Sequence, residues 1–188
     1  MTGPVDEGWN KENGPYGDQR SRPAGIEGID LGELSRDQRN LVLLDGLVTE
    51  FLESKFKDSV DVHCLHQIEK PIVAPTGVSD NSVITRTSIL KGRHSGTVYA
   101  HATSHIVVGN IPASFVGNLR SCRAGIGRLL RRYRVDYTRE MLWFGIEPRG
   151  QEEEATKHLL GDRFLTRCYR LVSASCPIVT ITERFPQE

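Results

Sequence analysis

The chain has 188 residues, which is enough for one domain with a substantial core and too few for two ordinary domains. Its 24 basic and 24 acidic residues cancel, so the whole molecule offers no general attraction to nucleic acid or to an anionic membrane. No apolar run approaches the roughly 18 residues of a membrane span, and the first residues lack the apolar core of a secretion signal. We therefore expect a cytoplasmic protein that binds neither nucleic acid nor membranes, with its oligomeric state left open.

The first part of the chain predicts a tail followed by two helices. Residues 1–33 are rich in Gly, Pro and charged residues, which predicts a disordered tail and leaves a single domain over residues 34–188. Ser35 and Gln38 have the spacing of a capping box and predict the start of a helix. A second helix is predicted over residues 48–55, where large apolar residues recur at helical spacing.

The rest of the chain is dominated by strand patterns. Strict alternation of apolar and polar residues begins at Val60, and residues 71–81 read as a loop. Short helices are predicted over residues 113–119 and 126–133, and strands over residues 60–68, 82–90, 97–108, 138–146, 163–172 and 178–185. Five or six strands joined by short turns, with the helices grouped between them, predict an α+β domain in which helices pack on one antiparallel sheet.

The last predicted strand carries a carboxylate among large apolar side chains. Because side chains alternate along a strand, Glu183 shares a face with Val179, Ile181 and Phe185. A carboxylate that has lost hydration is suited to exchange a proton near neutral pH or to bond a hydroxyl group. The alternative is that Glu183 is paired with an arginine or lies at a frayed strand end.

A second candidate, Arg86, lies in the middle of a predicted strand with no acidic residue anywhere in residues 82–90. A buried guanidinium is costly without an anion, so Arg86 must find one across the sheet or on a ligand. Its planar fork suits a carboxylate. The alternative is a cross-strand ion pair, which could involve Glu183 itself.

The strand predicted over residues 97–108 carries a row of polar residues. His101, Thr103 and His105 share one face, which could line a ligand cavity or simply face solvent. Histidines four residues apart on a strand stand roughly 13 Å apart, too far to share a metal ion. The four cysteines form no C-x-x-C pair, and we expect no metal site.

The most cationic stretch, residues 120–139, holds seven arginines. Within it, Gly125 and Gly127 flank the start of a predicted helix, where free N–H groups favour an anion. The stretch lacks the lysine and hydroxyl of a phosphate-binding loop. A solvated helix face and a nucleic-acid surface are the other interpretations, and the balanced overall charge speaks against the latter.

Five segments, in order, are similar to those of the chorismate pyruvate-lyases, the 4-hydroxybenzoate synthases, and in particular to a lyase-like bacterial branch. The resemblance as a whole runs from about residue 34 to residue 185. Its segments are residues 43–49 (LLDGLVT), 86–90 (RTSIL), 125–130 (GIGRLL), 137–140 (YTRE) and 177–185 (PIVTITERF). No single segment is specific, whereas five in the right order and spacing are. The resemblance implies a cofactor-independent lyase whose substrate is a small aromatic acid.

In that family an arginine holds the carboxylate of 4-hydroxybenzoate and a glutamate holds its hydroxyl. The resemblance places these roles on Arg86 and Glu183, with backbone N–H groups near Val48 and Ile126 assisting. A second arginine of the classical branch falls in a region where this sequence has His101 or Thr103.

The resemblance thus predicts elimination of pyruvate from chorismate. Two alternatives use the same fold: an enzyme of secondary metabolism that condenses an aromatic amine with an aldehyde, and a sensor that binds an aromatic acid without converting it. The changed position at His101 or Thr103 keeps the first alternative open.

Overall fold

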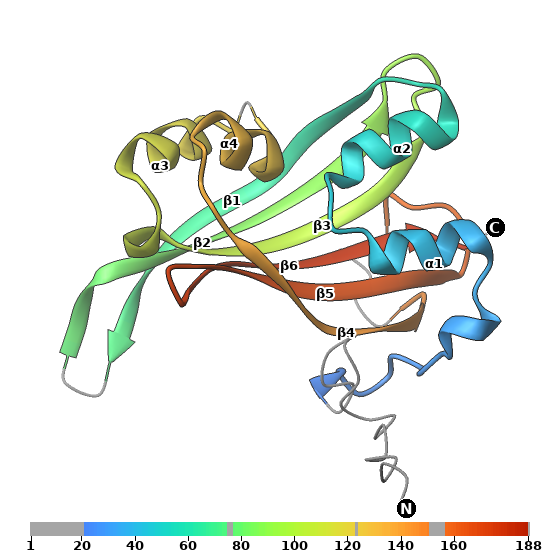
Figure 1. The fold of residues 1–188 in the computed structure, drawn as a ribbon, viewed down its shortest axis with the longest axis horizontal. Coiled ribbons are helices and arrows are strands. Elements are labelled where there is room, and N and C mark those ends of the chain that lie inside the picture. Colours follow the sequence, from blue (N-terminus) through green and yellow to red (C-terminus); the bar gives the residue numbers. More distant parts are fainter. Residues whose placement is uncertain (1–20, 75–76, 123, 151–156, 188) are drawn as a thin grey trace, which may run out of the picture.

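The computed structural model describes residues 21–74, 77–122, 124–150 and 157–187, and it confirms the predicted α+β architecture. A single antiparallel sheet has the strand order β1-β2-β3-β6-β5-β4, and all four α-helices lie over one of its faces (Figure 1). The strands are β1 (Val60–Ala74), β2 (Gly77–Gly92), β3 (Val98–Val107), β4 (Thr138–Pro148), β5 (Arg163–Ser173) and β6 (Cys176–Pro186). The helices are α1 (Arg36–Leu43), α2 (Val48–Phe56), α3 (Ala113–Arg120) and α4 (Ile126–Arg132).

A local sequence signal accounts for the start of α1. The capping box is present: Ser35 Oγ accepts from the Gln38 N–H at 3.3 Å, and Gln38 Oε1 accepts from the Ser35 N–H at 2.9 Å. One prediction was wrong. Residues 71–81, expected to form a loop, largely continue β1 and β2 into a hairpin that projects beyond the helices (Figure 1).

The boundary of the predicted tail also needs correction. Residues 21–33 are placed against the domain, and Glu27 exchanges backbone hydrogen bonds of 2.8 Å with Ile146 of the edge strand β4. Gly145 permits this approach, because a Cβ atom there would overlap the Glu27 carbonyl oxygen. A short 3-10 helix, Leu31–Glu33, follows. Residues 1–20 of the predicted tail lie outside the described residues.

The helix-covered face holds two apolar clusters. One packs α3 and α4 on the central strands through residues such as Phe115, Leu129 and Ile181. The other packs α1 and α2 on the opposite end of the same face, through residues such as Leu52 and Phe185. None of the helices in the described part of the chain is long and apolar enough to span a membrane.

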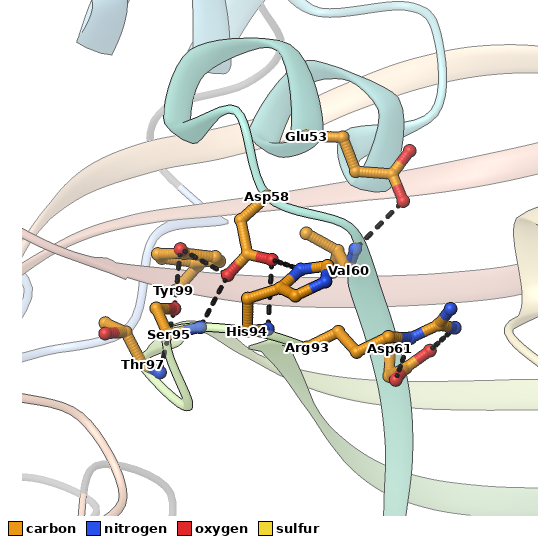
Figure 2. A network of polar contacts seen from close by, with 9 residues as sticks. All are labelled: Glu53, Asp58, Val60, Asp61, Arg93, His94, Ser95, Thr97 and Tyr99. Atoms are coloured by element: carbon orange, nitrogen blue, oxygen red, sulfur yellow. Dashed lines mark hydrogen bonds and ion pairs between the residues drawn. The ribbon is translucent and has the colours of Figure 1, made fainter.

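A buried carboxylate fixes the turn between β2 and β3 to the segment that joins α2 and β1 (Figure 2). Asp58 accepts hydrogen bonds from the N–H of Ser95 at 3.0 Å, from the N–H and Nδ1 of His94 at 3.1 and 2.9 Å, and from the Tyr99 hydroxyl at 3.3 Å. The Ser95 N–H, with the His94 donors, holds the pKa of Asp58 well below its ordinary value.

Replacing Asp58 with asparagine is therefore expected to lower the melting temperature at neutral pH. Because the folded-state pKa is depressed, the contribution of Asp58 is present above the unfolded-state pKa of about 3.9 and is lost as the pH falls through the folded value. The difference between the variant and the parent protein should therefore shrink in acid. Thermal unfolding followed by circular dichroism against pH measures this. Asp61→Asn is the matched control, since its exposed pair with Arg93 should matter less; equal losses in both variants would contradict the assignment.

Candidate functional site

A cavity lies between the two apolar clusters, under the N-terminal ends of α2 and α4. Its empty volume is about 710 Å³, which includes its opening to solvent. Most of its lining is apolar, contributed by Leu47, Val48, Val62, Leu90, Ala102, Ile126, Leu130, Leu171 and Ile181. Its polar lining comes from a few side chains, which include both candidates predicted from the sequence, Arg86 and Glu183.

Arg86 lines the cavity from β2 and is 1% exposed. Its Nε donates to Ser88 Oγ at 3.1 Å, and its Nη1 and Nη2 atoms are buried without a hydrogen-bond partner among the described residues. The neighbouring Cys64 thiol supplies no anion, because burial raises its pKa to about 11. The predicted alternative, an ion pair between Arg86 and Glu183, is not formed. Arg86 therefore has two donor nitrogens, which carry four N–H groups, available for an anionic ligand.

Glu183 lines the cavity from β6 and is 3% exposed. The predicted alternative of an arginine partner is realised by Arg167 on the neighbouring strand β5, whose Nε donates to Glu183 Oε2 at 2.8 Å. The Tyr169 hydroxyl donates to Glu183 Oε1 at 3.1 Å. Burial, together with the Glu183 carboxylate, raises the pKa of the Tyr169 phenol well above its ordinary range, so it remains a donor. Glu183 is thus a fixed hydrogen-bond acceptor and not an isolated carboxylate.

The spacing of these two side chains follows from the sheet. Arg86 is paired with Ser104 on β3, and Glu183 is paired with Ala102 on the other side of β3. Their Cα atoms are separated by two strand spacings across the sheet and by two residues along the strands, which corresponds to about 12 Å. Both side chains point to the helix-covered face, so their heads can take the two ends of one aromatic ring.

Two helix N-termini close the cavity on the side away from the sheet. Val48 and Ile126 are the first residues of α2 and α4, and both line the cavity. The preceding residues, Leu47 and Gly125, supply no side-chain cap, so the first N–H groups of each helix are available to a ligand. The two segments meet above the cavity, because a Cβ atom at Gly127 would overlap the Leu47 side chain.

Arg139 and Tyr169 are polar residues of the cavity that were not singled out from the sequence. Arg139, from β4, donates to the carbonyl oxygens of Leu44 and Gly46, and its guanidinium carbon lies 4.2 Å from the centroid of the Tyr169 ring. The family-like YTRE segment contains Arg139 and could have marked it as a candidate site residue. The sequence around Tyr169 predicts a strand and gives no indication of a role in the site.

His101 and Thr103, expected to replace a second arginine of the classical branch, are placed differently. The cavity is lined by Ala102 and Ser104, so their neighbours His101 and Thr103 point to the opposite face of β3. His101 is fully buried there, beside Arg184 in the register. The structure corrects this expectation, because strand parity alone could not tell which face would carry the cavity.

The site therefore combines a buried cation that no described residue pairs with, a carboxylate acceptor held by Arg167 and Tyr169, and an apolar wall. Within the described ranges, no group of three or more His, Cys, Asp or Glu residues is arranged to hold a metal ion. Such a site suits a small aromatic acid that carries a second polar group at its far end.

The comparisons with known proteins show which family and which fold the chain shares. A chorismate pyruvate-lyase from Mycobacterium tuberculosis (strain H37Rv) is 26% identical over 167 residues, which cover 83% of this chain and 82% of the relative. PhnF from Mycobacterium smegmatis shares the fold with a TM-score of 0.58 at 12% identity, covering 76% of this chain and 64% of that one. Its effector domain gives 0.55 at 12% identity, covering 74% and 88%.

A family model described as chorismate pyruvate-lyase Rv2949c-like matches residues 42–188, which include both flanking helix starts, Arg86 and Glu183. The match extends over well more than half of the chain. The chain belongs to the Rv2949c-like chorismate pyruvate-lyase family.

Proposed function

We propose that this protein eliminates pyruvate from chorismate and leaves 4-hydroxybenzoate. The observation that carries the proposal is the buried guanidinium of Arg86, whose Nη atoms have no hydrogen-bond partner among the described residues and which lines an apolar cavity. A ring carboxylate would supply the missing anion. The family and the M. tuberculosis relative support chorismate as the molecule that carries this carboxylate.

The reaction needs orientation more than chemical assistance, because aromatisation of the ring drives it. The ring carbon that bears the hydroxyl loses its hydrogen as a proton, and the bond between the neighbouring ring carbon and the enolpyruvyl oxygen breaks. The released enolpyruvate takes up one proton and becomes pyruvate, so no electrons are exchanged with another reactant. The protein must hold the ring, exclude water and provide an acceptor near the hydroxyl.

Glu183 is suited to that last role. Arg167 and Tyr169 hold its carboxylate in place from β5, and its position across the cavity from Arg86 matches a hydroxyl opposite the ring carboxylate. The segments that begin α2 and α4 would act as flaps, with the N–H groups of Val48 and Ile126 available to the bound ring.

Glu183→Gln is expected to reduce kcat by about 100-fold or more, since it removes the negative charge and the basicity of the carboxylate while preserving the shape of the side chain. The assay follows 4-hydroxybenzoate and pyruvate together and should find them in equal amounts, at a rate unchanged by a metal chelator. Glu140→Gln is the control, because Glu140 is an exposed residue paired with Arg170 on the sheet edge.

Absence of turnover by the parent protein would contradict the lyase proposal. Tight binding of 4-hydroxybenzoate without turnover would instead favour the sensor. The condensation alternative depended on His101 or Thr103 changing the pocket, and neither residue lines the cavity.

A further inference from the structure

The charges that line the cavity are unequal. Arg86, Arg128 and Arg139 contribute three cations, whereas Glu183 is the only carboxylate that the described residues bring to the lining, and it is already paired with Arg167 from β5. A ligand with one carboxylate would satisfy Arg86 alone. The lining therefore suits a ligand with two negative charges, and the proposed substrate has two carboxylates, one on the ring and one on the enolpyruvyl group.

The position of the second carboxylate follows from the chemistry of the substrate. The enolpyruvyl ether is attached to the ring carbon beside the one that carries the hydroxyl. With the ring carboxylate on Arg86 and the hydroxyl at Glu183, the enolpyruvyl group must lie at the Glu183 end of the cavity. The residue that binds its carboxylate must therefore be a cation close to Glu183.

Arg139 is that cation. Its guanidinium lies over the ring of Tyr169, and the Tyr169 hydroxyl donates to Glu183. Its side chain is 9% exposed, and the nearest carboxylate oxygen, of the largely exposed Asp45, lies 3.9 Å from Nε. A guanidinium has five N–H donors, and two are used by Leu44 O and Gly46 O. N–H donors of Arg139 therefore remain for a ligand carboxylate that lies beside the segment leading into α2.

Arg128 is the competing candidate and is less well placed. Its side chain is 54% exposed on α4, and its Nη2 donates to Val60 O at 3.3 Å, on the edge strand β1. Val60 stands at the far side of the sheet from β6, because β2 and β3 lie between them. A carboxylate beside Glu183 is thus closer to Arg139 than to Arg128.

We propose that Arg139 binds the second carboxylate of the substrate, and thereby makes the cavity selective for six-membered-ring dianions over single-carboxylate aromatic acids. The inference rests on the proposed function for the orientation of the ring. It adds a residue that touches the departing half of the substrate. As the carbon–oxygen bond breaks, the leaving group remains an anion, and the same guanidinium would stabilise it.

The test compares the binding of two ligands by titration calorimetry. The monoanion is 4-hydroxybenzoate. The dianion is 3-(carboxymethoxy)-4-hydroxybenzoate, a stable compound whose second carboxylate is attached through an ether to the ring carbon beside the hydroxyl. The parent protein should bind the dianion about tenfold or more tightly than the monoanion. In Arg139→Gln, affinity for the dianion should fall by about 30-fold or more, while affinity for the monoanion changes by less than about threefold. Unchanged monoanion binding also reports that the variant has folded.

Three outcomes would overturn the inference. The first is an equal loss of affinity for both ligands in Arg139→Gln, which would mean that Arg139 only supports the flap and Tyr169. The second is a selective loss of dianion affinity in Arg128→Gln instead, and the third is an unchanged KM for chorismate in Arg139→Gln. Failure of the proposed function would give a different result. The parent protein would then not convert chorismate, although it would still bind the dianion more tightly than the monoanion and would lose this preference in Arg139→Gln. Arg139→Lys, which keeps the charge without the fork, should retain part of the selectivity.

Discussion

Replacing Arg86 with methionine is expected to weaken binding of an aromatic acid by about 100-fold while raising the free energy of unfolding by about 1–3 kcal/mol. The loss follows from removing the only cation of the cavity floor whose Nη atoms lack a hydrogen-bond partner among the described residues. The gain follows because the guanidinium is 1% exposed and has no anionic partner in the part of the chain that the structure describes, whereas a buried methionine side chain needs none.

Two measurements on the same variant separate the effects: titration with 4-hydroxybenzoate, and urea unfolding without ligand. Arg93→Met is the control, because Arg93 follows β2 in an exposed turn and is paired with Asp61 at 2.6 Å, so binding should not change. A variant that loses both binding and stability would show that Arg86 is a structural cation with a protein partner, and would remove the main support for the ligand site.

Replacing Arg167 with methionine is expected to lower the free energy of unfolding by about 3–5 kcal/mol, because it leaves Glu183 buried without its partner. The side chains of this pair are 0% and 4% exposed. Arg167 also donates from Nη1 to carbonyl oxygens at the end of α1, among them Leu41 O and Leu44 O, so the variant frees the end of that helix as well.

Arg170→Met is the matched comparison, three residues along the same strand. Arg170 is paired with Glu140 at 2.6 Å, but the two side chains are 40% and 46% exposed, and the expected loss is below about 1 kcal/mol. Adding Glu183→Gln to Arg167→Met should recover part of the stability, because it removes the unpaired charge. Equal losses in the two single variants would contradict the buried-pair interpretation.

The two arginine variants are expected to change the free energy of unfolding in opposite directions, because the two buried side chains have different partners. Burial of the Arg86 guanidinium destabilises the folded protein until a ligand supplies an anion. Arg167 stabilises the folded protein because it pairs with the buried carboxylate of Glu183. One buried arginine thus belongs to binding and the other to the scaffold, although both lie in the middle of strands on the same face of the sheet.

Much of this protein was determined by local sequence. The capping box at Ser35, the helix starts at Val48 and Ile126, and the shared face of Ile181 and Glu183 depend on spacings of a few residues, which side-chain geometry fixes regardless of the rest of the fold. Local sequence also marks Glu183, by its apolar strand face, and Arg86, by its place in a strand without an acidic residue, as candidate site residues.

Tertiary structure decided what each of these side chains faces. The partner of Glu183 is Arg167 because β5 pairs with β6 in one particular register, and a shift of one residue would have turned Arg167 away. Arg139 enters the cavity from an edge strand, through a contact with a loop more than 90 residues earlier in the chain. His101 and Thr103 were misplaced because alternation tells which residues share a face, but only the packing of helices on the sheet tells which face holds the cavity.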